Sequence, residues 1–183
     1  VQDLEFHELN EHTTPEEVEA LMKLFDDWRD VGLITEAGLP AVADPGAQLV
    51  RLCHRHGVEV VPMSGPSSLM LALMASGLNG QSFAFLGYLP AKTEERRQAL
   101  RSIEKHSSTA RQTKIFIETP YRNDSLLADI LSVCRADTEV CIAANITMPD
   151  AFIRTKTAGQ SASGSQSRRR THQCAGYAVK DRA

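Results

Sequence analysis

The sequence predicts an α/β fold whose central sheet is parallel. Short apolar runs alternate with segments of helical periodicity, and loops rich in Gly and Pro separate them. The first two runs, residues 31–35 (VGLIT) and 58–63 (VEVVPM), are mostly apolar and do not alternate with polar residues. Strands that alternate with helices imply a parallel sheet with right-handed crossovers, and apolar strands imply helices on both faces.

Two helices are expected in the first third of the chain. Thr14 is a suitable N-cap, and Glu17 follows it at the spacing of a capping box. Apolar residues then recur at helical spacing, so the first helix should end near Asp30. The second helix is expected over residues 45–56, where a glycine at the C′ position ends it.

The remainder of the chain continues the alternation. The predicted helices span residues 69–76, 93–106 and 123–133, and the predicted strands span residues 83–88, 114–118, 139–145 and 152–157. We place the domain boundary before the strand at 83–88. This gives an N-terminal α/β domain over residues 1–80 and a C-terminal α/β domain over residues 81–158.

Residues 159–183 differ in character from the rest of the chain. Ser, Gly, Gln and Arg dominate this tail, and its apolar residues show almost no periodicity. Such a segment does not bury enough apolar surface to offset its ordering entropy, so a disordered tail is predicted. The tail after Gln160 holds five of the 20 basic residues and one of the 23 acidic ones, so the first 160 residues carry a net charge of about −7. The body therefore lacks the overall basic excess typical of phosphate-driven nucleic-acid binding.

The composition indicates a soluble, cytoplasmic protein. Hydrophobic residues make up 42% and charged residues 23% of the chain. No apolar run approaches the roughly 18 residues of a membrane span, and the start lacks the pattern of a signal peptide. The four cysteines form no CxxC pair and no cluster with zinc-finger spacing, so we expect reduced thiols and no metal site: Cys53, Cys134, Cys141 and Cys174.

Three loops at predicted strand ends are candidate ligand sites, because open α/β sheets bind ligands there. Loop Glu36–Gly46 places Gly38 among small alanines, which suits a ligand lying against main chain and equally suits a tight turn. Loop Ser64–Ser68 begins a helix, so its free N–H groups suit an anion, although ordinary capping explains the same serines.

The third loop, Thr119–Asn123, follows Glu118 at the end of a predicted strand and contains Arg122. An acid and a cation at this spacing suit acid–base chemistry, and a salt bridge that ties the loop down is an equal alternative. The chain contains no Walker A motif, no GxGxxG, no G-x-S-x-G and no Ser/His/Asp order. Spacing alone therefore indicates an α/β protein with loops suited to a small-molecule ligand.

Four segments, taken in order, resemble the tetrapyrrole methylase family, the class III SAM-dependent methyltransferases. They are LITEAGLPAVADPG, VVPMSGPSSLMLALMASGL, FAFLGYLP and FIETPYRN. The resemblance covers roughly residues 4–157 and is nearest to the branch that methylates a cytidine ribose 2′-oxygen of small-subunit (16S) rRNA. It implies two α/β domains of tetrapyrrole methylase type, with the SAM cleft between them.

The resemblance also implies site residues. SAM, S-adenosyl-L-methionine, is expected against Ala37, Gly38, Leu39, Pro40, Ala41, Val42, Gly65, Pro66, Ser67, Ser68, Asn145 and Ile146. Glu118 as base and Arg122 as a stabiliser of charge are the candidate catalytic residues. Substrate contacts are expected from Lys92, Arg96, Arg97 and Tyr121, although the cations also suit a solvated helix face. The implied partners are ribosomal RNA or the small ribosomal subunit and a second copy in a homodimer, without a membrane.

The sequence departs from the family pattern at several places. The first strand of the N-domain, with its glycine- and proline-rich loop, is missing from the matched region, and the tail replaces the usual final strand and helix. Residues 144–147 and Tyr121 stand where the rRNA branch has an acid, a lysine and a histidine. Two alternatives to an rRNA methyltransferase therefore remain: a truncated, non-catalytic fragment, and a methylase of a small, tetrapyrrole-like molecule.

Overall fold

The computed structural model describes residues 4–26, 30–163 and 175–180, the last of these by its backbone. The chain divides into two compact units, Val1–Ser67 and Ser68–Ala183. The division lies earlier in the chain than the expected boundary at residue 80, because helix α3 (Ser68–Ser76) packs on the sheet of the second unit. Thr155 Oγ1 on that sheet donates a hydrogen bond to Ser76 O at 2.7 Å.

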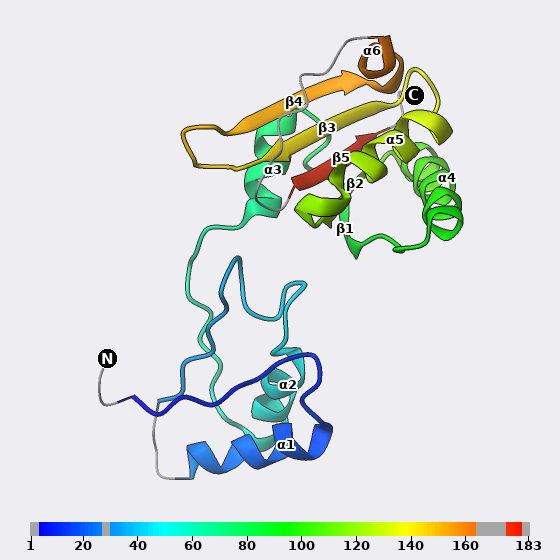
Figure 1. Cartoon of the computed structure of the whole chain (residues 1–183). Helices are drawn as coiled ribbons and strands as arrows, with labels where there is room; N and C mark the ends of the chain where they lie inside the picture. Colours follow the sequence, from blue (N-terminus) through cyan, green and yellow to red (C-terminus); the bar gives the residue numbers. More distant parts are fainter. Residues whose placement is uncertain (1–3, 27–29, 164–174, 181–183) are drawn as a thin grey trace. The chain divides into compact units, whose positions relative to one another are not determined.

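The first unit is built on two short helical segments (Figure 1). Helix α1 (Pro15–Ala20) continues into the 3-10 helix Leu21–Phe25, and α2 (Ala47–His56) packs against them. The predicted capping box is confirmed, since Thr14 N donates to Glu17 Oε2 at 2.7 Å and Glu17 N donates to Thr14 Oγ1 at 3.3 Å. The buried core of this unit comprises Val18, Leu49, Leu52 and Cys53.

The strands predicted at residues 31–35 and 58–63 are wrong for the part of the chain that the structure describes. Both segments are extended but belong to no β-ladder. A strand needs a hydrogen-bonded neighbour, and the described part of the first unit offers none to either segment. Some of their apolar side chains are left open to solvent, with Ile34 76% and Met63 84% exposed, whereas Val58 and Val60 pack against the core of the first unit.

The second unit holds a five-stranded sheet in the order β1-β2-β5-β3-β4. The strands are β1 Phe83–Tyr88, β2 Thr113–Glu118, β3 Glu139–Ala144, β4 Phe152–Thr157 and β5 Ala175–Lys180. Only the β1/β2 pair is parallel; the pairs β2/β5, β5/β3 and β3/β4 are antiparallel. The α/β class predicted for this half of the chain is confirmed, and the β3/β4 pair is antiparallel because the loop that joins the two strands is too short for a crossover.

Strand β5 lies in the tail that composition predicted to be disordered. It fits between β2 and β3, where the backbone of Tyr177 is in register with Phe116 on one side and Ile142 on the other. Its sequence, AGYAVK, carries a β-forming tyrosine and valine that the polar average of the tail conceals. Helix α6 (Ala158–Ser163) precedes it, and the rest of the predicted tail, residues 164–174 and 181–183, lies outside the described residues.

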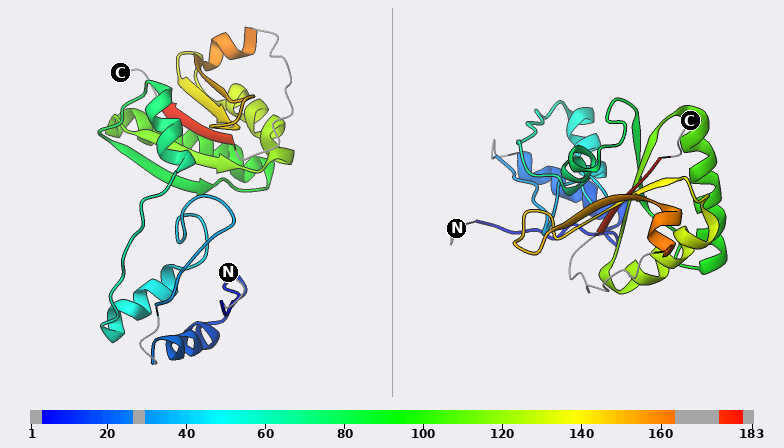
Figure 2. Two further views of the ribbon diagram at one scale, coloured as in Figure 1. Left: turned by 90° about the vertical axis from the view of Figure 1, so that its left-hand side faces the viewer. Right: turned by 90° about the horizontal axis from the view of Figure 1, so that it is seen from above.

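Helices cover both faces of this sheet (Figures 1 and 2). Ile115 packs with Leu73 of α3, whereas the neighbouring Phe116 packs in the cluster that contains Leu100 of α4 (Thr93–Ala110) and Leu126 of α5 (Asn123–Val133). Successive strand residues point to opposite faces, so α3 lies on one face and α4 and α5 on the other. Among the described residues, no helix combines the length and apolar character of a membrane span.

Candidate functional site

Two of the three candidate loops come together within the first unit. A Cβ atom placed on Gly65 would lie 3.4 Å from Leu39 Cδ2. Leu39 and Gly65 therefore lie close together, although they are 26 positions apart along the chain. The sequence placed both loops at strand ends, and the structure adds that a side chain at position 65 would meet the side chain of Leu39.

The backbone of loop 36–46 adopts a left-handed conformation at several positions. Gly38 has φ 81° and Gly46 has φ 128°, and the two alanines Ala41 and Ala43 have φ 63° and 59°. A left-handed alanine costs on the order of 1–2 kcal/mol, so the surrounding contacts must hold it there. Such strain concentrates at ligand-binding sites.

Three hydrogen bonds hold this strained loop. Thr35 Oγ1 donates to Asp44 Oδ2 at 3.0 Å, which closes the loop across its base. Ala41 N donates to Pro45 O at 3.1 Å, and Val42 N donates to Leu39 O at 3.2 Å. These bonds keep the main chain of 37–42 in a fixed shape at the surface. Of the implied cofactor-binding residues in the first unit, Leu39, Pro40, Ala41 and Ser67 are half-buried, and Ala37, Gly38, Val42, Gly65 and Pro66 are exposed.

In the second unit, Asn145 directly follows β3 and holds an unsatisfied acceptor. It is 7% exposed and has φ 51°. Its Nδ2 donates to Asp150 Oδ2 at 2.7 Å, whereas its buried Oδ1 has no hydrogen-bond partner among the described residues. A buried acceptor without a donor is costly, and a ligand that donates a hydrogen bond would remove that cost. Ile146, the other residue implied here, is half-buried.

Glu118 and Arg122 form an ion pair at the carboxyl end of β2. Arg122 Nη2 donates to Glu118 Oε2 at 2.6 Å and to Leu89 O at 2.9 Å, and Thr119 N donates to Glu118 Oε1 at 2.8 Å. The Glu118 side chain is 0% exposed and that of Arg122 is 21% exposed. A carboxylate with no exposed surface and both oxygens occupied does not reach a substrate without breaking the pair. The geometry favours the salt-bridge alternative over the expected role of a base.

The four residues expected to contact the substrate differ in how far their side chains are exposed to solvent. Arg96 is 3% exposed; its Nε donates to Asp129 Oδ2 at 2.7 Å and its Nη1 to Ala91 O at 2.9 Å. Its guanidinium thus faces α5 rather than solvent, which differs from the expectation. Arg97 also binds Asp129, through Nε to Oδ1 at 2.8 Å, and keeps 38% of its side chain exposed. Lys92 and Tyr121 are 81% and 82% exposed.

Asp129 is a residue that sequence reasoning did not single out. Burial acts to raise the pKa of its carboxyl, but hydrogen bonds from Arg97 and Arg96 and their charges outweigh burial, so the pKa is lowered. The residue lies on α5, far along the chain from both arginines, and no local motif marks it. Only the packing of α5 on α4 reveals this network.

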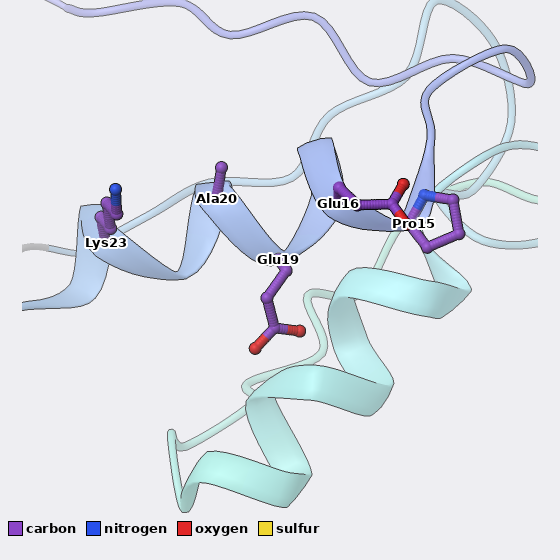
Figure 3. Close-up of a pocket in the computed structure, with 5 residues that line it drawn as sticks. All are labelled: Pro15, Glu16, Glu19, Ala20 and Lys23. Atoms are coloured by element: carbon purple, nitrogen blue, oxygen red, sulfur yellow. The ribbon is translucent and has the colours of Figure 1, made fainter.

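A shallow pocket of about 490 Å³ lies on α1 and its continuation (Figure 3). Its lining residues are Pro15, Glu16, Glu19, Ala20 and Lys23, all from one stretch of chain. None of them belongs to the candidate loops, so the pocket does not bear on the chemistry. Among the described residues, no three or more His, Cys, Asp or Glu side chains come together as a metal site.

Comparison with known proteins places these loops in a family. The model of the tetrapyrrole (corrin/porphyrin) methylases matches residues 3–162. The chain belongs to the tetrapyrrole methylase family. It is similar to the ribosomal RNA small subunit methyltransferase I of Vibrio cholerae, with 38% identity over 76% of this chain and 47% of that protein. The corresponding protein of Escherichia coli O157:H7 is 36% identical over 76% of this chain and 47% of that protein.

Among solved structures, the tetrapyrrole methylase chain is similar to the methyltransferase CobJ. The TM-score is 0.60 at 16% identity, over 92% of this chain and 72% of CobJ. This likeness supports the fold alone. The chain spans about half the length of the two curated relatives, 47% of each.

Proposed function

We propose that this member of the tetrapyrrole methylase family takes part in transfer of a methyl group from SAM to ribosomal RNA of the small subunit. The observation that carries the proposal is the 38% identity to the V. cholerae protein named ribosomal RNA small subunit methyltransferase I. The matched stretch contains both loops that meet at Leu39 and Gly65. The ribose 2′-oxygen is the proposed acceptor, the cytoplasm the proposed location and a homodimer the proposed assembly.

The residues present fit a cofactor such as SAM. The exposed main chain at 37–42 offers a fixed surface, and no atom lies within 4 Å of a Cβ built on Gly38. In the second unit, the buried Asn145 Oδ1 has no hydrogen-bond partner among the described residues. It could therefore accept a hydrogen bond from an amino group of a ligand. We propose that the loops around Leu39 and Gly65 hold SAM, which supplies an electrophilic methyl group when bound. Asn145 and Ile146 are the residues of the second unit for which we propose a cofactor contact.

The chain's own residues then act by binding and orientation. Methyl transfer is an in-line displacement, so alignment and exclusion of water supply most of the acceleration. The strained loop 36–46 is held in shape by hydrogen bonds within the loop and across its base. Glu118 and Arg122 hold the segment after β1 in place through the carbonyl of Leu89. We therefore propose that the pair positions the site.

A labelling experiment tests the proposal. The protein would be incubated with SAM carrying a labelled methyl group and with small ribosomal subunits that lack the modification. The label is expected in RNA and should be lost on digestion with ribonuclease. Label in a tetrapyrrole and none in RNA would contradict the rRNA substrate, and transfer to neither by the folded protein would contradict the methyltransferase function.

A further inference from the structure

Two exposed tyrosines share one edge of the sheet in the second unit. Tyr88 is the last residue of β1 and is 50% exposed, and Tyr121 follows β2 in the 3-10 helix Pro120–Arg122 and is 82% exposed. Strands β1 and β2 are parallel neighbours, with Tyr88 in register with Ile117. Their carboxyl ends therefore lie at the same edge, and both rings belong to it.

A hydrogen bond fixes the backbone that carries these rings. Arg122 Nη2 donates to Leu89 O at 2.9 Å, and each of these residues directly follows one of the tyrosines. Leu89 is 6% exposed, and Arg122 is anchored by the fully buried Glu118. The two segments are thus tied to each other beneath the surface while both tyrosine side chains remain at it.

A bulge places Tyr88 at this edge. The register of β1 against β2 shifts between Phe85 and Tyr88, and Gly87 has φ 68°. Bulges of this kind re-aim a side chain and are frequent next to functional sites. A residue other than glycine would be strained at that φ. Glycine at position 87 therefore allows the backbone conformation that the bulge requires.

The surroundings of the two rings suit nucleic acid. Lys92, in the loop after β1, is 81% exposed and pairs with Glu95, and Arg97 on α4 keeps 38% of its side chain exposed while it binds Asp129. Exposed aromatic rings together with exposed cations are the features with which proteins hold unpaired nucleotides, by stacking on bases and attracting phosphates.

We propose that Tyr88 and Tyr121 form a stacking platform for unpaired bases of the RNA substrate. The inference rests on the RNA half of the proposed function and adds to it the form of the substrate, which is single-stranded at the contact. Stacking uses the aromatic ring and not the hydroxyl group, so phenylalanine in place of either tyrosine should preserve binding.

Binding of a labelled oligoribonucleotide tests the platform. The probe is a single strand of mixed sequence, about ten nucleotides long, followed by fluorescence anisotropy with the full chain. Tyr88→Ala and Tyr121→Ala should each weaken binding about tenfold, whereas Tyr88→Phe and Tyr121→Phe should stay within about twofold. Phe83→Ala is the matched control, because Phe83 is 40% exposed at the opposite end of β1, and it should also stay within about twofold.

The outcomes separate the platform from the proposed function. Wild-type affinity in both alanine variants overturns the platform, as does an equal loss in Phe83→Ala or tighter binding of the same sequence as a duplex. If the wild type methylates RNA but the alanine variants bind normally, the platform fails and the proposed function stands. If the wild type neither binds the single strand nor methylates RNA, both fail.

Discussion

Glu118 Oε2 lies 2.6 Å from Arg122 Nη2, and the carboxylate has no exposed surface. The same nitrogen binds the carbonyl of Leu89, so one guanidinium joins the ends of two neighbouring strands. Arg122 Nε is buried without a hydrogen-bond partner among the described residues. The pair therefore ties the ends of the two strands together. We expect its loss to lower the free energy of unfolding, rather than to act on methyl transfer directly.

Glu118→Gln should lower the free energy of unfolding by roughly 2–4 kcal/mol, because it leaves a largely buried guanidinium without its counter-charge. Urea unfolding followed by circular dichroism measures the change. Glu94→Gln is the matched control, since Glu94 is 85% exposed on the same unit and should change stability by less than about 0.5 kcal/mol. A variant as stable as the wild type that has lost methyl transfer would instead support the role of Glu118 as a base.

Asp129→Asn should cost about 3 kcal/mol, since it leaves the buried Arg96 without its carboxylate partner. Asp124→Asn on the same helix is the control, because Asp124 is exposed, and its effect should stay within a few tenths of a kcal/mol. Thermal unfolding of the two variants beside the wild type checks the difference. Equal stability of Asp129→Asn and Asp124→Asn would show that the network contributes little.

The same carboxyl predicts a dependence of stability on pH. The pKa of Asp129 is lowered in the folded protein, so its contribution is present in full above the unfolded value of about 3.9 and is lost as pH falls through the folded value. Denaturant midpoints measured from pH 6 downward should therefore fall below about pH 4 more steeply in the wild type than in Asp129→Asn. Parallel curves for the two proteins would contradict this.

The thiols of Cys53, Cys134 and Cys141 should be unreactive in the native protein. Burial, with the nearby Glu104 carboxylate, raises the pKa of Cys134 to about 12, and burial raises the pKa of the other two. Since the thiolate is the nucleophile, alkylation at pH 7.5 should be slow. Ellman's reagent on a Cys174→Ser background checks this, with the protein in guanidinium as the fully reactive reference. A rapid reaction of the native protein would refute the burial.

Gly46→Ala should destabilise the first unit and disturb loop 36–46. The position has φ 128°, and an added Cβ would lie 2.7 Å from Leu33 Cδ2. We expect a loss of about 1–3 kcal/mol from strain and steric overlap. Gly32→Ala is the control in the same unit, because no atom lies within 4 Å of its Cβ position and its φ is ordinary. Hydrogen exchange of residues 36–46 should increase in Gly46→Ala and not in Gly32→Ala.

Elements with a strong local signal could be predicted from the sequence. The capping box at Thr14 and the helix Asn123–Val133 lie where their residue patterns place them. The strands at 31–35 and 58–63 could not be judged locally, because an apolar run becomes a strand only when a neighbour pairs with it. Strand β5 was not predicted for the same reason, because its pairing partners β2 and β3 are distant in the chain.

The candidate site likewise has features that local spacing predicts and features that depend on distant segments. The proximity of Glu118 and Arg122 follows from their spacing, but the carbonyl that completes the clamp comes from Leu89, which no local pattern indicates. Arg96 looks like an exposed cation in the sequence, and only the packing of α5 shows that Asp129 binds it. Contacts between distant segments, rather than residue identity, decided which charged side chains remain available to a substrate.

Binding of S-adenosylhomocysteine tests most directly whether the loops around Leu39 and Gly65 belong to a SAM site. Titration calorimetry with the full chain should give one saturable site, and Gly38→Val should weaken it strongly because a β-branched residue is strained at φ 81°. Gly80→Val, which belongs to the second unit and to neither loop, should bind as the wild type does. Absence of binding by a wild-type chain whose circular dichroism shows it to be folded would contradict the account.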